Sequence, residues 1–336
     1  MFSFIVENKG KNANAVTTAY MEIVKDACVK VCDDIEYIPR GEKPKSKNSF
    51  VASDTIQVSL EYLLKGYKNQ IVWMQGIVPE ESYMRNHSKL RYWVLSFMER
   101  IVLKKSKLLL LVSDEMRLYY EKKYRLKLSQ KSVIMPCFNE LGVSKTAFDK
   151  EKYKNNTFVY VGSLYKWQCF EETVRFYSEI EKESDYTTRL FVYTFQQKEA
   201  EELLSKYGVR NYEVDCVDAN ELSQRIESVK YGFVLREDNP VNNVATPTKL
   251  SNYISNGIIP IYSKAIRSFA EYDAEASIGV VCDLDDIETG VSNVLSHMKL
   301  NISAEEMQKK CETAFSGYYC RDLYVEKISE KIEKLV

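Results

Sequence analysis

Short apolar runs alternate along this chain with longer amphipathic segments, and this alternation constrains the fold more than any other feature. The short runs have the length of buried strands, and the longer segments repeat apolar residues at helical spacing. A parallel strand pair needs a crossover of a dozen or more residues, so the alternation predicts α/β architecture with doubly wound parallel sheets. In the first half we expect strands at 2–6, 35–38, 50–52, 71–74, 108–112 and 133–135, with helices at 15–31, 55–66, 86–105 and 114–124.

The alternation is interrupted once and then resumes. The interruption, CFNELGVSKTAFDKEKYKNN, is polar and irregular, and we interpret it as a linker, because 336 residues are comfortable for two domains. The predicted division is 1–140 for an N-terminal domain, 141–156 for the linker, 157–317 for a C-terminal domain and 318–336 for a final amphipathic helix. In the second half we expect strands at 158–161, 190–194, 212–217, 233–235, 258–262 and 278–282, with helices at 170–181, 197–207, 220–230, 285–299 and 303–314.

The overall composition excludes several classes of protein. A balance of 47 basic and 48 acidic residues leaves no general charge for binding nucleic acid. The eight cysteines form no C-x-x-C pair, which argues against a zinc site and for a reducing compartment. No window is apolar enough to span a membrane, and the N-terminus lacks the basic start of a signal peptide. We therefore expect a cytoplasmic location.

Residues 231–262 are the part of the chain most clearly marked as strand, polar loop, helix and strand. The helix is predicted to start with Thr246 as its N-cap and to stop at Gly257. A helix N-terminus offers free N–H groups and a partial positive charge, and Arg236 and Lys249 add two cations. This arrangement suits a phosphate, although a lysine in a first helical turn is more often simply solvated.

A second loop is expected to reach the same place. Residues 162–168, GSLYKWQ, follow the first strand of the C-terminal domain, and both loops leave carboxyl ends of parallel strands. Gly162 permits close backbone approach, while Ser163 and Lys166 offer a hydroxyl and a cation. Together the two loops predict a diphosphate site.

These segments resemble the donor half of a known enzyme group. VYVGSLYKW, followed by GFVLREDN and NNVATPTKLSNYISNGIIPI, is similar to retaining GT-B glycosyltransferases, family 4-like, of bacterial surface-polysaccharide clusters for capsule or O-antigen. MQGIVPEES and LLLLVSDEM resemble the N-terminal domain of that group. The resemblance implies two Rossmann-like domains facing a central cleft, and transfer of a sugar from a nucleotide diphosphate-sugar to a glycan.

The resemblance also assigns roles to residues. Arg236 and Lys249 match the basic residues that stabilise the leaving diphosphate. Asn252 stands where many relatives have a glutamate that binds ribose, and Val244 replaces the first glutamate of the E-x7-E pair, which puts donor identity and, more weakly, activity in doubt. The expected donor-binding set is Gly162, Ser163, Lys166, Asn242, Asn243, Thr248 and Asn252. No metal and no other cofactor is required by this interpretation.

The acceptor is expected in the N-terminal domain, where the signals are weaker. Gly10 follows the first strand, and Gln75 and Gly76 follow another, with Glu80 and His87 nearby. A lone histidine of this kind is more often a surface loop residue than a functional group.

The segment 85–131 carries a local excess of cations interleaved with aromatic residues. Such a pattern suits an anionic membrane surface, although a solvated face above a core stripe produces it equally well. Since acceptors in the resembling group are commonly lipid-linked, we expect peripheral contact with the inner face of the membrane. The alternative to an enzyme is a catalytically silent glycosyltransferase-like module that binds a partner or a glycan.

Overall fold

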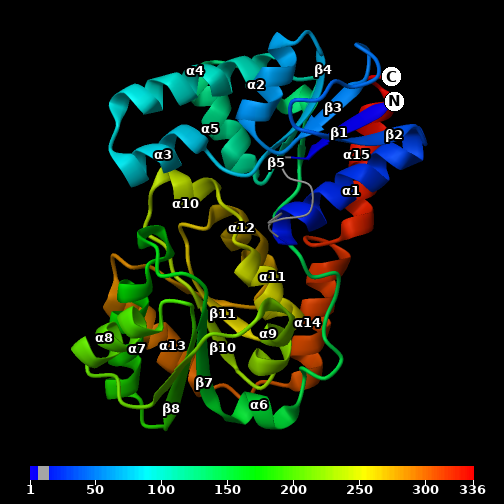
Figure 1. Cartoon of the computed structure of the whole chain (residues 1–336). Helices are drawn as coiled ribbons and strands as arrows, with labels where there is room; N and C mark the ends of the chain where they lie inside the picture. Colours follow the sequence, from blue (N-terminus) through cyan, green and yellow to red (C-terminus); the bar gives the residue numbers. More distant parts are fainter. Residues whose placement is uncertain (7–14) are drawn as a thin grey trace. The chain divides into compact units, whose positions relative to one another are not determined.

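The computed structural model describes residues 1–6 and 15–336, except for the side chains of residues 6, 15, 16, 219 and 220. Packing divides the chain into two compact units. Unit 1 comprises Met1–Asn139, Asn243–Thr246 and Cys320–Val336, and unit 2 comprises Glu140–Asn242 and Pro247–Tyr319. Each unit is built around one parallel six-stranded sheet with helices packed on it (Figure 1), which confirms the predicted fold class.

The sheet of unit 1 has the strand order β2-β1-β3-β4-β5-β6, and every neighbouring pair is parallel. Its inner strands are buried on both faces, which explains why β5 reads as four leucines without alternation. The strands are β1 (Phe2–Val6), β2 (Ile35–Pro39), β3 (Phe50–Ser53), β4 (Asn69–Met74), β5 (Leu108–Leu111) and β6 (Ser132–Ile134). The helices are α1 (Ala15–Val31), α2 (Ile56–Leu64), α3 (Val78–Asn86), α4 (Lys89–Lys105), α5 (Asp114–Tyr124) and α15 (Arg321–Glu333).

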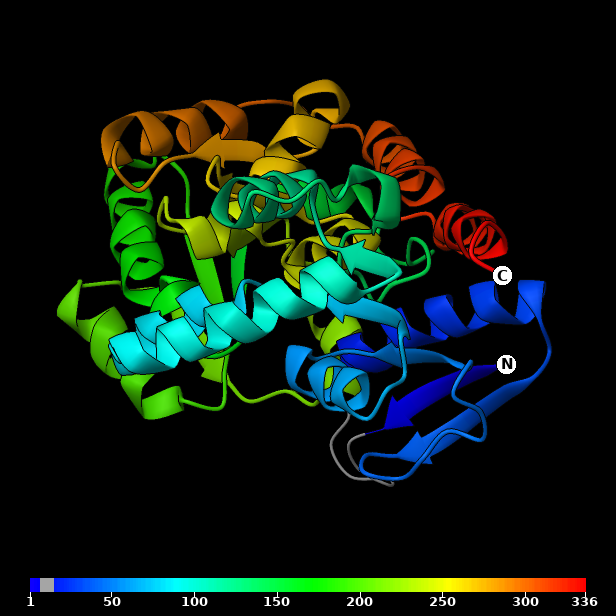
Figure 2. The same ribbon diagram turned by 90° about the horizontal axis from the view of Figure 1, so that it is seen from above.

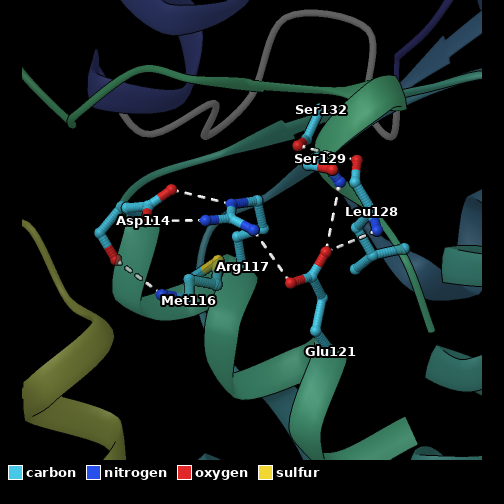
Figure 3. Close-up of polar contacts among 8 residues, drawn as sticks. Asp114, Met116, Arg117, Glu121, Leu128, Ser129 and Ser132 are labelled. Atoms are coloured by element: carbon cyan, nitrogen blue, oxygen red, sulfur yellow. Dashed lines mark hydrogen bonds and ion pairs between the residues drawn. The ribbon is translucent and has the colours of Figure 1, made fainter. Parts of the chain in front are cut away.

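Helix α5 and the loop that follows it are tied together by one arginine and one glutamate (Figure 3). Arg117 Nε donates to Asp114 Oδ1 over 2.8 Å, and its Nη1 donates to Glu121 Oε2 over 2.9 Å. The other oxygen of Glu121 accepts the backbone N–H groups of Leu128 and Ser129 at 2.7 and 3.3 Å. The charge of Arg117 is thereby neutralised, and the chain is directed back into the sheet at β6.

The last helix of the chain belongs to unit 1, where α15 lies beside α1 (Figure 1, Figure 2). Arg321 pairs with Asp26, and Lys30 Nζ lies 2.5 Å from Glu326 Oε2. Ile328 of α15 is fully buried. The C-terminal segment thus completes the core around the first helix.

The sheet of unit 2 has the order β12-β11-β10-β7-β8-β9, again parallel throughout. The order reverses between β7 and β10, so the connections from these two neighbours leave in opposite directions. The strands are β7 (Asn156–Val161), β8 (Thr188–Tyr193), β9 (Tyr212–Asp215), β10 (Tyr231–Val234), β11 (Ile259–Ser263) and β12 (Val280–Cys282). The helices are α6 (Lys150–Lys154), α7 (Phe170–Glu183), α8 (Gln197–Lys206), α9 (Ala219–Ile226), α11 (Thr248–Ser255), α12 (Arg267–Ala276), α13 (Ile287–Met298) and α14 (Ala304–Ser316). The short helix α10 (Pro240–Val244) begins in unit 2, and its last two residues belong to unit 1.

Several segments differ from the sequence predictions. The region predicted as a linker contains α6, where Asp149 accepts the N–H of Glu151 at 2.8 Å, and Tyr153 is buried. The polar loop predicted after β10 contains the short helix α10, and α12 has no counterpart among the predicted helices. The single helix predicted at 86–105 is preceded by α3, which ends where His87 adopts a left-handed conformation with φ of 50°.

The start predicted for the helix α11 is also wrong. The helix begins at Thr248 with Pro247 as its N-cap residue, and no side chain caps it. Thr246 Oγ1 instead accepts the N–H of Cys137 over 2.9 Å within unit 1. The Thr246 hydroxyl, which the local sequence predicts to cap α11, forms a long-range hydrogen bond instead.

Candidate functional site

The candidate site lies in unit 2, at the carboxyl ends of β7 and β10. In open α/β sheets a ligand binds where the strand order reverses, because the two departing loops leave an opening there. The loop after β7 begins at Gly162 and closes with the 3₁₀ turn Lys166–Gln168, and β10 is followed by Arg236. Helix α11 brings Lys249 to the same place.

One side chain joins the two cations. The side-chain oxygen of Gln168 accepts Arg236 Nη2 at 2.6 Å and Lys249 Nζ at 2.9 Å. Arg236 also donates Nη1 to the backbone oxygens of Gln168 and Leu235, at 3.1 and 2.8 Å. The predicted convergence of the two loops therefore includes direct contacts, and Gln168 is their meeting point.

No carboxylate forms an ion pair with Arg236 or Lys249 among the residues that the structure describes. Arg236 is 5 % exposed and Lys249 is half-buried. Burial, with the charge of Arg236 as a smaller cause, holds the pKa of the Lys249 ammonium well below its usual value. Burial likewise lowers the pKa of Arg236. Two desolvated cations sharing a neutral oxygen form a site that favours an anion.

Gly162 and Tyr160 shape the space around Lys249. The ammonium lies 4.4 Å from the centre of the Tyr160 ring, a cation–π distance. Gly162 has φ of +128°, and a Cβ added there would lie 3.0 Å from Lys249 Cε and 3.1 Å from Nζ. The backbone conformation favours glycine at this position, and a side chain there would also displace the end of Lys249.

The other residues predicted in these two loops are less engaged. Lys166 is exposed, and its side chain makes no hydrogen bond or ion pair in the described part of the chain. Ser163 contributes its carbonyl, which accepts the Tyr160 hydroxyl at 2.8 Å. Thr248 is the first residue of α11, at the helix end that adjoins Lys249.

The three predicted asparagines lie in distinct surroundings. Asn242 is buried, and its Nδ2 donates to the carbonyl of Glu237 at 2.9 Å, so this amide holds the segment after β10 together. Asn243 and Asn252 each have a buried side-chain oxygen without a hydrogen-bond partner in the described structure. An unpaired buried acceptor costs free energy, and a ligand hydroxyl or amine can satisfy it.

Unit 1 has a cavity of about 300 Å³ at the carboxyl ends of β3 and β4. Two of the predicted acceptor-side residues, Gln75 and Gly76, line it. Glu81 also lines it, and burial raises the pKa of this carboxyl. The indole nitrogen of Trp73, another lining residue, is buried and has no hydrogen-bond partner in the described structure.

The remaining acceptor-side residues lie elsewhere. Glu80 Oε1 accepts the hydroxyls of Tyr92 and Tyr119 and the ammonium of Lys123, at 3.0, 2.5 and 2.7 Å, and does not line the cavity. His87 is exposed at the C-terminal end of α3. Gly10 lies outside the residues that the structure describes.

Two residues of these sites are absent from the sequence predictions, Gln168 and Glu81. Gln168 is the last residue of the loop 162–168, two positions before α7, and a polar residue at the end of this loop is the signal that could have found it. Glu81 lies in the first turn of α3, two residues after Pro79. Proline and glutamate are both favoured in a first helical turn, and this pattern could have marked the residue.

No group of three or more His, Cys, Asp and Glu side chains suited to a metal ion occurs among the described residues. No helix in the described ranges is long and apolar enough to cross a membrane.

Comparison with known proteins identifies the fold. No protein-family model and no curated protein matches the sequence. Among solved structures, WaaG, a glycosyltransferase involved in lipopolysaccharide biosynthesis, has a TM-score of 0.64 at 16 % identity, covering 100 % of this chain and 99 % of WaaG. Sucrose-phosphate synthase from Thermosynechococcus elongatus has a TM-score of 0.73 at 10 % identity, covering 99 % of this chain and 98 % of the synthase.

A third similar structure, Anabaena Alr3699/HepE in complex with UDP and glucose, has a TM-score of 0.70 at 9 % identity, covering 99 % of this chain and 100 % of HepE. Identities this low show the fold alone. The chain therefore has the GT-B fold of these glycosyltransferases, built from two Rossmann-like units.

Proposed function

We propose that this protein is a glycosyltransferase that moves a sugar from a nucleotide diphosphate-sugar to a glycan acceptor. The proposal rests on one observation. Arg236 and Lys249 donate to the same Gln168 oxygen, and these two desolvated cations have no counter-ion in the described structure. The fold supports it, since similar structures are glycosyltransferases and one is a complex with UDP and glucose.

The two cations supply what this reaction chiefly needs. The bond between the anomeric carbon and the donor phosphate oxygen breaks, its electron pair leaves with the diphosphate, and the acceptor oxygen forms the new bond while its proton passes to an oxygen of the leaving diphosphate. Negative charge thus develops on the leaving diphosphate, where Arg236 and Lys249 would stabilise it. We propose that the reaction retains the anomeric configuration. We also propose that it needs no metal ion, because the two fixed cations stabilise the charge that a metal ion would otherwise neutralise.

The donor base and ribose would contact the rest of the site. Asn252 stands one turn beyond Lys249 on α11, and its unpaired side-chain oxygen accepts a hydroxyl donor such as ribose offers. Thr248 and the N–H groups at the start of α11 would contact phosphate oxygens. The cavity in unit 1, with Gln75, Gly76 and Glu81, is the proposed acceptor site.

We further propose that the acceptor is lipid-linked and that α4 contacts an anionic membrane at the cytoplasmic face. Helix α4 exposes an apolar stripe of Leu90, Trp93, Val94 and Phe97, with exposed fractions of 77 %, 69 %, 52 % and 67 %. These four residues have the i, i+3, i+4, i+7 spacing of one helix face. Exposed cations without an ion pair in the described structure accompany them, namely Lys89, Arg91, Arg100 and Lys104.

Membership of family 4 and of a capsule or O-antigen pathway is part of the same proposal. It is supported by the likeness to WaaG and by the P-T-K motif of α11.

The test is transfer activity after removal of each cation. Lys249→Ala and Arg236→Ala should each lower transfer by at least about a hundredfold, the typical effect of losing one charge-stabilising donor. Lys182→Ala, at an exposed ion pair with Glu179 on α7, is the control and should retain full activity. Circular dichroism establishes that the variants fold. Undiminished turnover in either site variant contradicts the proposal.

A silent binding module is the competing function, favoured by the absent E-x7-E glutamates. Thermal unfolding with UDP and GDP separates the two, because a ligand that binds only the folded state raises its stability. Stabilisation of the wild type, lost in Lys249→Ala, supports the enzyme. No stabilisation at millimolar nucleotide supports the module.

A further inference from the structure

Unit 2 has a second cavity, at the opposite ends of the strands that form the candidate site. It measures about 440 Å³ and includes Asn156, the first residue of β7, and Lys230, which directly precedes β10. β7 and β10 are neighbours in the sheet. Asn156 precedes Gly162, and Lys230 precedes Arg236, by six positions of extended chain, so the two sites lie about 20 Å apart.

Lys230 is the main reason to regard this cavity as a binding site. The residue is 2 % exposed, yet its ammonium makes no hydrogen bond or ion pair in the described part of the chain. The ammonium lies over the Tyr231 ring, 5.1 Å from its centre. The backbone is held firmly, since Lys230 N donates to Thr157 Oγ1 at 3.0 Å and its carbonyl accepts from Ile259. A lysine whose side chain is almost wholly removed from bulk water, and whose ammonium faces a cavity without a counter-ion, favours an anion that joins it there.

The other charged residues that line the cavity are mostly cations. Lys150, Lys154 and Lys299 bring three further lysines to the rim, of which Lys154 is paired with Glu151 outside the lining and Lys299 has no ion pair in the described structure. The single carboxylate of the lining, Glu305, is already paired with Lys150 at 3.0 Å. The cavity thus has an excess of positive charge, and its volume suits a small organic ligand.

Asn156 indicates that the ligand also carries a hydrogen-bond donor. Its side-chain oxygen is buried and has no partner in the described structure. The terminal torsion of an asparagine is soft, so a small rotation directs this oxygen to a ligand in the cavity. Tyr153 and Met298 provide apolar walls beside it.

We infer that this cavity binds a phosphate monoester that carries hydroxyl groups, of the sugar-phosphate class, with its phosphate on Lys230 and a hydroxyl on Asn156. This inference is independent of the proposed donor site.

The test measures binding of glucose 6-phosphate and of inorganic phosphate by calorimetry at constant ionic strength. The wild type should bind both, with the sugar phosphate bound more tightly. Lys230→Met, a neutral side chain of similar length, should weaken glucose 6-phosphate roughly ten- to hundredfold, as expected for a lost charge-assisted hydrogen bond. Asn156→Leu should weaken the sugar phosphate while leaving inorganic phosphate unchanged.

Two controls locate the binding. Lys249→Met removes a cation of the candidate donor site and should leave glucose 6-phosphate binding unchanged, so failure of this inference is distinct from failure of the proposed function. Lys182→Met controls for the loss of any surface charge. If Lys230→Met does not fold, the rim variant with Lys154→Met and Lys299→Met should show the same weakening. Unchanged affinity in Lys230→Met or in the rim variant, loss of binding in Lys249→Met, or no binding to the wild type at millimolar ligand would each overturn the inference.

Discussion

The ammonium of Lys249 donates to the side-chain oxygen of Gln168 over 2.9 Å. The same oxygen accepts Arg236 at 2.6 Å, so a neutral amide occupies the position between two cations where a phosphate oxygen would be stabilised best. A diphosphate that enters this site has to displace the amide or share the cations with it.

Replacing Gln168 by glutamate should close the site to anions. The carboxylate of Gln168→Glu would form ion pairs with Arg236 and Lys249, which relieves the cost of their unpaired burial. The thermal midpoint should therefore rise, while affinity for UDP should fall by at least about tenfold, because the cations are already neutralised. Thermal unfolding and a UDP titration measure both effects.

Gln168→Met is the matched contrast. It removes the shared oxygen without adding charge, so it should lower the thermal midpoint and leave the cations open to UDP. Wild-type affinity for UDP in Gln168→Glu would show that the cations do not bind the diphosphate.

Gly162→Ala should displace the ammonium of Lys249. The backbone φ of +128° disfavours any side chain, and the new Cβ would lie 3.0 Å from Lys249 Cε. We expect a loss of about 1–3 kcal/mol of folding free energy from backbone strain, with weaker UDP binding. Gly142→Ala is the control, because φ there is not left-handed and no atom lies within 4 Å of the added Cβ. Equal effects of both substitutions on UDP affinity would contradict the role given to Gly162.

The affinity for UDP should decrease as the pH rises. The decrease should begin at a lower pH than it would for a lysine with an ordinary pKa. Burial holds the pKa of free Lys249 well below its usual value. A bound diphosphate favours the protonated ammonium, so binding is tightest below the pKa of the free protein and weakens as the pH passes through it. Calorimetry at a series of pH values above 7 measures this decline. Lys249→Met should bind more weakly throughout and should lose this part of the pH dependence, and a decline retained in that variant would assign it to another group.

Helix α4 should bind anionic vesicles through its exposed stripe. Trp93→Glu with Phe97→Glu removes two of the most exposed apolar side chains and adds charge of the wrong sign, so co-sedimentation with phosphatidylglycerol vesicles should fall at least tenfold. Neither side chain is buried, and the thermal midpoint should change little. Tyr186→Glu, at an exposed aromatic of unit 2, is the control. Undiminished sedimentation of the double variant would exclude α4 as the contact surface.

Local sequence explains most of the fold and the two cations of the candidate site. The spacing of apolar residues in β1 and α1 predicts their positions to the residue, because one period matches a buried strand and the other an amphipathic helix. The placement of Arg236 and Lys249 near one another follows because Arg236 comes just after β10 and Lys249 begins the helix that leaves the same end of the sheet. For helices such as α12 the pattern is weak, since Phe269 and Asp273 are its two buried residues, and Asp273 accepts the hydroxyl of Tyr262.

What the sequence by itself determined is therefore the alternation of strands and helices, the glycine loop and the presence of two cations beside it. Only the tertiary structure decided which groups neutralise which charges. Gln168 meets Arg236 and Lys249, which are 68 and 81 residues away along the chain, and Lys230 meets no counter-ion in the described structure. Hydrogen bonding and desolvation depend on distances between segments remote in sequence, and these distances are set by the packing of the sheet and its helices, not by any local pattern.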